Sequence, residues 1–207
     1  MRGRSGTMLD AAAAVREGGR VAYPFVESPN FTPANRRSIG VVVMHTMEIA
    51  ERSDAAEICA RWFRSQVSQV SAHYCVDADS VIRCVEEKDI AWHARGGNTN
   101  SIGVELAGFA SQTVRDWRDP YSRAVLARAS SLVADVCRRR RIPVRWLVAD
   151  DLLAGRRGLT GHNEVSRAFK RSDHWDPGDG FPVEAFLDSV RKLEQAQRRA
   201  ARARTKV

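Results

Sequence analysis

Two segments of the sequence are apolar almost without interruption, and they constrain the fold more than any other feature. They are SIGVVVMH at residues 38–45 and SIGVELAGF at residues 101–109. A strand with one face in water alternates apolar and polar residues, whereas a strand covered on both faces is apolar throughout. Both segments therefore predict strands in the interior of a sheet that is covered on both sides.

Helices are expected to cover the two sides of this sheet. Three segments have apolar residues at helical spacing. By residue number they are 53 to about 66, 121–141 and 183 onward. Two short strands are expected around a turn at 77–80, and residues 142–153 indicate a strand followed by a short helix or a loop. Because strands and helices alternate without internal repeats, we predict an α/β fold: a single domain with a central mixed β-sheet flanked by helices.

The chain divides into three parts. Residues 1–37 lack periodicity and contain the proline-rich string YPFVESPNFTP, which predicts an extended N-terminal lead. Residues 38–190 form the folded domain, and residues 191–207 form a basic, helical C-terminal tail. The net charge is +8, and residues 191–207 contribute +6 of it. Such a tail attracts polyanions or anionic surfaces without specificity.

Several classes of protein and site are disfavoured. No segment approaches the roughly 18 consecutive apolar residues that cross a bilayer, and Asp10 and Arg16 interrupt the stretch where an export signal needs an apolar core. No nucleic-acid recognition motif is present. None of the four cysteines belongs to a CxxC pair, which argues against a zinc knuckle. Cys75 and Cys84 could pair across a hairpin, although free buried thiols are expected.

The five histidines suggest a metal site without specifying one. His45 ends the first apolar strand, His162 follows a glycine in what we expect to be a loop, and His174 stands two residues before Asp176. A catalytic zinc ion needs three protein ligands and one open position, and these residues could supply them. By spacing alone, separate histidines that are each satisfied in the core are the commoner arrangement, and no HExxH motif is present.

Five strings occur in order along the chain: VVVMHTME, VSAHYCVDADSVIRCVEEKDIAWHA, NSIGVELAG, LTGHNEVS and HWDPGDGFP. Together they resemble the type 2 N-acetylmuramoyl-L-alanine amidases. This zinc-dependent family includes phage lysis amidases, bacterial cell-wall recycling amidases and animal peptidoglycan recognition proteins. The resemblance covers about residues 38–188, so it implies that 38–190 is an amidase catalytic domain. It also implies hydrolysis of the amide between the lactyl group of N-acetylmuramic acid and L-alanine of the stem peptide.

The resemblance implies specific roles for five residues. His45, His162 and Asp176 would bind Zn²⁺, and Glu105 would take a proton from the attacking water and return it to the leaving nitrogen. A surface salt bridge is the alternative for Glu105, but this residue interrupts an apolar run. Where the family often has a lysine, two residues before the third ligand, this chain has His174. We expect His174 to stabilise the oxyanion, although it could instead replace Asp176 as the ligand.

A further group of residues is predicted to line the substrate groove. Trp92, His93 and Asn100 are its members, and a structural hydrogen bond is the alternative for His93. For His73, which begins the predicted hairpin, packing is at least as good an interpretation as a place in the cleft.

The expected function is therefore zinc-dependent cleavage of peptidoglycan. A phage endolysin fits best, held in the host cytoplasm until a holin releases it to the wall. The alternatives are a muropeptide-recycling amidase of the bacterial cytoplasm and a noncatalytic peptidoglycan-binding module. The expected partners are peptidoglycan or muropeptides, with a possible contact between residues 191–207 and an anionic wall polymer or lipid. We expect a monomer with no specific nucleic-acid partner.

Overall fold

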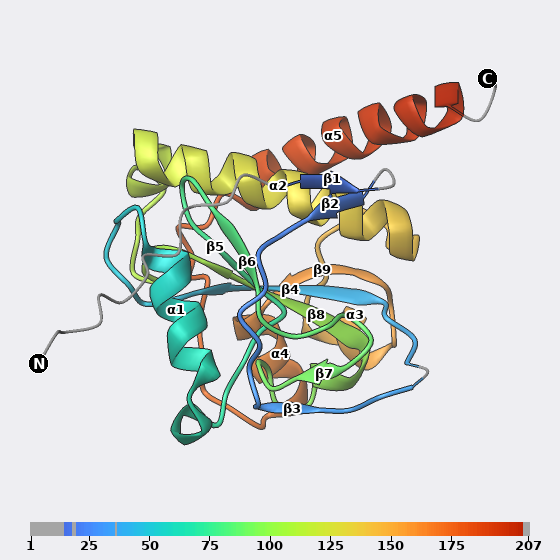
Figure 1. Ribbon diagram of the computed structural model, residues 1–207. Coiled ribbons are helices and arrows are strands. Elements are labelled where there is room, and N and C mark those ends of the chain that lie inside the picture. Colours follow the sequence, from blue (N-terminus) through green and yellow to red (C-terminus); the bar gives the residue numbers. More distant parts are fainter. Residues whose placement is uncertain (1–14, 18–19, 36, 205–207) are drawn as a thin grey trace, which may run out of the picture.

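The centre of the molecule is a five-stranded sheet with the strand order β6-β5-β8-β4-β9 (Figure 1). The computed structural model describes residues 15–17, 20–35 and 37–204. The five strands are β4 (Val41–Thr46), β5 (Tyr74–Val76), β6 (Val81–Arg83), β8 (Ser101–Leu106) and β9 (Gly158–Gly161). Strands β5, β8, β4 and β9 run parallel, and β6 pairs antiparallel with β5. The predicted mixed sheet is confirmed.

Helices cover this sheet, and two small strand pairs lie outside it (Figure 1). The helices are α1 (Ala55–Arg64), α2 (Pro120–Arg140), α3 (Ala149–Leu153), α4 (His162–Phe169) and α5 (Val183–Arg204), with short 3₁₀ turns at Gln66–Ser68, Asn98–Asn100 and Asp116–Arg118. The outer pairs are β1 (Val15–Glu17) with β2 (Arg20–Ala22), and β3 (Phe31–Thr32) with β7 (Ile90–Ala91). Within the described residues, no helix combines the length and apolar character that crossing a bilayer requires.

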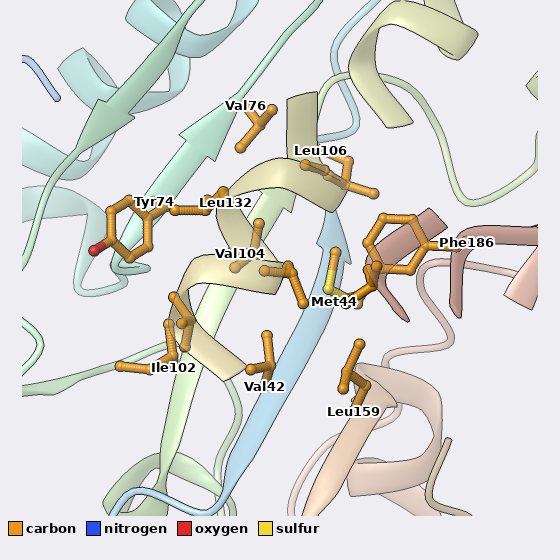
Figure 2. Packing of buried hydrophobic residues seen from close by; sticks show 14 of the residues in the cluster. Val42, Met44, Tyr74, Val76, Ile102, Val104, Leu106, Leu132, Leu159 and Phe186 are labelled. Carbon is orange, nitrogen blue, oxygen red and sulfur yellow. The ribbon is translucent and has the colours of Figure 1, made fainter. Parts of the chain in front are cut away.

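One face of the sheet is sealed by a continuous apolar core. Val42 and Met44 of β4 point to this face and pack with alternate residues of β5 and β8 against Leu132 of α2 and Phe186 of α5 (Figure 2). Helices α2 and α5 lie side by side across this face (Figure 1). Their apolar faces match the helical periodicity of the sequence, since burial of such a stripe is what stabilises a helix in a protein.

The opposite face is covered in two separate places. Under α1, Cys59 and Phe63 pack on Cys75 of β5, and around α4, Val165 packs on Val43 of β4. Side chains two residues apart along a strand point to the same face of the sheet. His45 of β4 therefore lies on this face together with Val43, between the two apolar clusters. The gap between α1 and α4 is the position of the candidate site.

Most of the expected elements are present at the expected places. The two interior strands occur at Val41–Thr46 and Ser101–Leu106, and the helices predicted from residues 53, 121 and 183 begin at Ala55, Pro120 and Val183. The hairpin also forms, between β5 and β6. All four cysteines are free and buried, and the Sγ atoms of Cys75 and Cys84 lie 3.7 Å apart. The division of the chain at residues 37 and 190 stays a prediction; residues 1–14 of the lead lie outside the described residues, and α5 continues past 190 to Arg204.

Two local predictions are wrong. Residues 142–148 form no strand beyond an isolated bridge between Trp146 and Leu159, because Pro143 has no N–H to donate and the segment turns into α3. His162 does not lie in a loop but is the first residue of α4, directly after β9. Strand β9 escaped prediction because its sequence, GLTG, is short and glycine-rich, whereas parallel pairing with β4 stabilises it.

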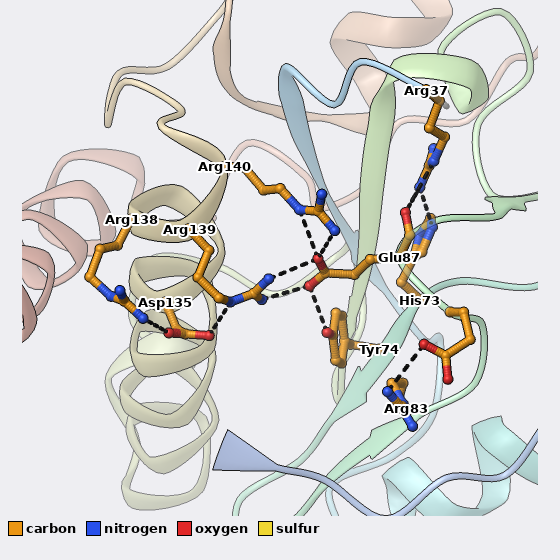
Figure 3. A network of polar contacts seen from close by, with 10 residues as sticks. Arg37, His73, Tyr74, Arg83, Glu87, Asp135, Arg138, Arg139 and Arg140 are labelled. Carbon is orange, nitrogen blue, oxygen red and sulfur yellow. Dashed lines mark hydrogen bonds and ion pairs between the residues drawn. The ribbon is translucent and has the colours of Figure 1, made fainter. Parts of the chain in front are cut away.

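A buried carboxylate joins the loop after β6 to the end of α2. Glu87, 8 % exposed, accepts hydrogen bonds from Arg139 and Arg140 at 2.6–3.0 Å and from the Tyr74 hydroxyl at 2.8 Å (Figure 3). Burial alone would raise the pKa of Glu87, but the two guanidinium groups and the tyrosine outweigh it and lower the pKa to about 2. The charged form of Glu87 therefore stabilises the fold.

Glu87→Gln should lower the free energy of unfolding by about 3 kcal/mol at neutral pH, because two half-buried arginines lose their charged partner. The folded-state pKa lies below the unfolded value of about 4.3. This stabilisation is therefore complete above about pH 4.3 and is lost as the pH falls towards 2. Urea unfolding at several pH values measures both effects.

Glu86→Gln provides the matched control, since among the described residues its carboxylate pairs with Arg83 near the surface, and its side chain is 41 % exposed. It should change the unfolding free energy by less than about 1 kcal/mol. Equal effects of the two substitutions would contradict a special role for Glu87.

Candidate active site

Three side chains from separate segments converge at the carboxyl edge of the parallel strands. His45 stands near the end of β4, His162 begins α4 after β9, and Asp176 lies in the loop before α5. His45 Nδ1 is 3.0 Å from Asp176 Oδ2, and His162 Nδ1 is 3.3 Å from Asp176 Oδ1. One ligand atom from each residue lies within 4.8 Å of the other two. Two imidazole nitrogens and a carboxylate oxygen at this spacing can hold one metal ion.

The electrostatics of these groups suit a cation. All three residues are buried. Burial alone would raise the pKa of Asp176, but hydrogen bonds from His162 and His45 outweigh it and hold the pKa well below its usual range. Burial lowers the pKa of His162. An ionised carboxylate and a neutral imidazole are the forms that bind metals.

The ring nitrogens that face away from Asp176 have partners of their own. His45 Nε2 lies 3.0 Å from His93 Nδ1, His93 Nε2 lies 3.1 Å from Ser101 Oγ, and Ser101 Oγ donates to the Gly97 carbonyl at 2.6 Å. If His45 presents the Nδ1 lone pair to a cation, its Nε2–H donates to His93, and His93 donates to Ser101. With a cation in place of the Nδ1 proton, each step has one donor and one acceptor, so the row of hydrogen bonds supports the His45 tautomer that binds metal.

A glycine in the second interior strand makes room for this row. Gly103 lies opposite Val43 in the sheet, and a Cβ atom added at Gly103 would come within 2.5 Å of His93 Cγ. Only a residue without a side chain allows the His93 ring to lie against the strand beside His45. The glycine of SIGVEL is therefore part of the site, although it has no chemical group to offer.

Glu105 places a carboxyl group beside the three converging residues. It pairs in register with His45 on the neighbouring strand, at the usual strand separation of about 4.8 Å. Burial, followed by the nearby Cys59, Asp176 and Glu48 groups, raises the pKa of Glu105 well above its usual range. A buried carboxyl group with a raised pKa is the kind of group that serves in general acid–base catalysis.

These groups open into a cavity of about 600 Å³ between α1 and the loop before α5. His174 belongs to its wall: its ring stacks on His162 with centroids 4.4 Å apart, and its Nδ1 lies 3.6 Å from Asp176 Oδ1. The His174 side chain is 61 % exposed, so it can reach a bound molecule. Gly178, at φ +82°, lets the chain turn after Asp176, since a side chain there would overlap the Ala110 carbonyl.

The fold brings together nearly all of the residues that the sequence singles out. The cavity is lined by the expected residues His45, Trp92, His93, Glu105, His162, His174 and Asp176. The expectation that Asn100 lines the substrate groove is not met. Asn100 precedes β8, at the opposite end of that strand from Glu105, and does not line the cavity. His73 is fully buried and accepts a hydrogen bond from the Gly103 amide at 3.0 Å, which is a packing role.

Four further residues of the site are not evident from the sequence. Ser101 orients His93, and Glu48, Trp62 and Trp175 line the cavity. Two of them carry a usable signal: Glu48 follows the His45 strand end by three residues, and Trp175 stands between His174 and Asp176. Trp62 carries none, because it lies on an amphipathic helix where an aromatic residue ordinarily indicates core.

Comparisons with known proteins agree on one family. The family described as N-acetylmuramoyl-L-alanine amidase (Amidase_2) matches residues 28–179. The N-acetylmuramoyl-L-alanine amidase A of Achromobacter lyticus is 29% identical over 185 residues, which cover 83% of this chain and 94% of that protein. Among solved structures, the Staphylococcus aureus hydrolase AmiA superposes with a TM-score of 0.64 at 18% identity, covering 83% of this chain and 82% of that chain. A mutant endolysin from Bacillus subtilis gives 0.53 at 18% identity, covering 82% and 99%. At these identities the two structures show a shared fold.

His93→Ala should weaken divalent metal binding about 10–100-fold, because His45 loses the acceptor that holds its tautomer. Ser101→Ala should act in the same direction with a smaller effect. Titration of the metal-stripped proteins with Zn²⁺ against a chelator of known affinity measures the dissociation constants. Trp92→Ala is the control, since it alters the same cavity wall without touching the three converging residues, and its metal affinity should match the wild type. Wild-type affinity in His93→Ala would contradict the proposed row of hydrogen bonds.

Proposed function

We propose that this chain, which belongs to the N-acetylmuramoyl-L-alanine amidase family and is an amide hydrolase, works with a Zn²⁺ ion held by His45, His162 and Asp176. The observation that carries the proposal is the convergence of these three ligand atoms beside Glu105, in a cavity open to solvent. The bond cleaved would be the amide between the lactyl group of N-acetylmuramic acid and L-alanine of the peptidoglycan stem.

The donor set fits zinc. Two imidazole nitrogens and one carboxylate oxygen are a usual set for catalytic zinc, which keeps its fourth position for water or substrate. Among the described residues, the group suited to a metal has these three members and no fourth. The cavity adjoins the ligands, so a substrate can reach them. Asp176 is preferred to His174 as the third ligand because it is buried and contacts both histidines, whereas His174 is largely exposed.

Glu105 is proposed as the group that moves the proton. The bound zinc ion would lower the pKa of water and polarise the scissile carbonyl. Glu105 would take a proton at its carboxylate and return it to the L-alanine nitrogen as the amide bond breaks. Its place in the strand next to His45 sets it beside the proposed metal ligands, and burial raises its pKa.

His174 is proposed to stabilise the oxyanion. Its ring is held by stacking on His162, and its exposed edge lies in the cavity wall. A positioned N–H that meets developing negative charge typically contributes about 10²–10³ in rate.

The proposed setting is lysis of intact cell wall by a phage endolysin, held in the host cytoplasm until a holin releases it. The open cavity with exposed tryptophans favours a polymeric substrate over a small soluble one. A muropeptide-recycling enzyme of the bacterial cytoplasm is the alternative. Release of free L-alanine amino termini from purified walls, compared with release from soluble muropeptides, separates the two settings. Binding of walls without any release would indicate the noncatalytic module instead.

The basic end of α5 is proposed to contact anionic wall polymers or lipid head groups. Arg198, Arg199 and Arg202 are exposed on the last turns of this helix, which projects from the fold (Figure 1). Attraction of this kind is nonspecific and is screened by salt.

Glu105→Gln should keep the metal but reduce turnover about 10²–10⁴-fold, because the amide cannot accept the proton. Turnover is measured as new amino termini from peptidoglycan, and metal content by elemental analysis. Glu48→Gln serves as the control: it removes a second carboxylate from the same cavity, yet its amide oxygen can still accept from Thr46 and the Ala110 amide. A near-normal rate in Glu105→Gln would remove its role.

The ligand set can be tested by metal retention. His45→Ala and Asp176→Ala should lose both bound metal and wall lysis, because two ligands rarely retain Zn²⁺ against dialysis. His174→Ala should keep the metal and lose about 10²–10³ in rate. Loss of metal in His174→Ala with retention in Asp176→Ala would make His174 the third ligand, and full activity of His45→Ala without metal would refute the site.

A further inference from the structure

Three of the four cysteines gather between α1 and the sheet. Cys59 of α1, Cys75 of β5 and Cys84, which directly follows β6, pack in the same small apolar cluster. The Sγ atoms of Cys75 and Cys84 lie 3.7 Å apart, and the Cys59 thiol is a second neighbour of Cys75. Cys137 stands apart, in the core under α2. We call Cys59, Cys75 and Cys84 the thiol cluster.

The thiol cluster borders the proposed proton-transfer group. Cys75 pairs in register with Glu105, and Glu105 pairs in register with His45. Residues in register on neighbouring parallel strands point to the same face of a sheet, so the Cys75 side chain stands beside Glu105 on the face that carries the site. Cys59 is also among the groups near Glu105. The proposed mechanism uses none of these thiols.

The members of the thiol cluster differ in their access to solvent. Cys59 lies in the wall of the active-site cavity and is 5 % exposed, whereas Cys75 and Cys84 are fully buried. Burial raises the pKa of the Cys75 thiol well above its usual range, which keeps that thiol protonated and unreactive towards reagents in solution. A small reagent that enters the cavity therefore meets Cys59 first.

The arrangement suits exchange with a low-molecular-weight disulfide. The Cys59 sulfur attacks one sulfur of the reagent, which forms a mixed disulfide and releases one small thiol. The neighbouring Cys75 sulfur then attacks Cys59 Sγ, which forms a Cys59–Cys75 bond and releases the second small thiol. Two protein thiols thereby lose two electrons and two protons, and the reagent gains them as two thiol molecules.

This bond would disturb the site. A disulfide holds its sulfur atoms about 2.05 Å apart, whereas neighbouring thiols of the cluster, Cys75 and Cys84, are separated by 3.7 Å. Closing such a gap between Cys59 and Cys75 draws α1 towards β5, next to Glu105. Because protein interiors are closely packed, the movement has to displace the part of the cavity wall that α1 supplies.

We propose that the thiol cluster is a redox-sensitive modification site: small uncharged disulfides react at Cys59, Cys75 takes over the bond, and amide hydrolysis stops until a reductant restores the thiols. The inference goes beyond the proposed function. It depends on amide hydrolysis only for its readout of activity, and it depends neither on the metal nor on the identity of the substrate.

Exposure of the full chain to bis(2-hydroxyethyl) disulfide, a small uncharged reagent, tests the proposal. Peptide mapping by mass spectrometry should find Cys59 linked to Cys75. Turnover, measured after desalting as new amino termini from peptidoglycan, should fall about 10²-fold, the loss typical of a misplacement of about 1 Å at a site. Dithiothreitol should restore both the thiols and the turnover. Unmodified Cys59 and Cys75 after exposure would overturn the proposal.

Three variants separate the roles of the thiols. Cys59→Ala should keep its turnover and become insensitive to the reagent, because the entry point is gone. Cys75→Ala should stop at the mixed disulfide on Cys59, with the mass of one reagent half added. Cys137→Ala, which removes a buried thiol outside the cluster, should respond like the wild type. Circular dichroism verifies that each variant is folded.

Two results for the variants would contradict the proposed order of events. One is inactivation of Cys59→Ala at the wild-type rate, and the other is a Cys75–Cys84 bond that forms in Cys59→Ala as fast as the wild type reacts. Mapping of the bonds needs no substrate, so it stands even where the wild type fails to hydrolyse peptidoglycan. That failure would instead overturn the proposed function.

Discussion

The parallel pairing of β4 with β8 and β9 is the interaction on which the rest of the structure depends. It sets His45 in register with Glu105 on one side, and on the other it brings the end of β9 level with Met44, so that His162 follows at the same edge. Slippage of either strand by one residue would turn its polar side chains to the opposite face. The register of the hydrogen bonds between these buried strands therefore has two consequences. It places the apolar side chains in the core, and it brings the polar residues of the site together.

The two faces of the sheet have different roles: one forms the main core, and the other carries the site. The face under α2 and α5 is filled by one continuous apolar cluster. The other face carries two smaller clusters, and the site lies in the gap between them. Rigid packing on one side thus supports an open, polar arrangement on the other. Glu87 and its arginines reinforce the rigid side by tying the loop after β6 to the end of α2 (Figure 3).

In the site, three converging residues contact one another, and two further residues support one of them. His45, His162 and Asp176 hold one another, and His93 and Ser101 hold His45 from behind. The low pKa of Asp176 and the raised pKa of Glu105 arise in the same buried region but from opposite causes: Asp176 accepts hydrogen bonds from two imidazoles, whereas Glu105 is buried beside other acidic groups. Two carboxyl groups in different environments can therefore take different chemical roles.

The sequence by itself determined the elements and most of the chemistry. Uninterrupted apolar runs indicated the interior strands, helical spacing indicated α1, α2 and α5, and the motif resemblance pointed to His45, His162, Asp176 and Glu105. The tertiary structure alone decided which groups meet. It excluded Asn100 from the cavity, placed His162 on a helix, recruited Ser101 and gathered three tryptophans at one mouth. The physical reason is that a local pattern reports periodicity and burial, whereas neighbours across a sheet are set by pairing between segments far apart in the chain.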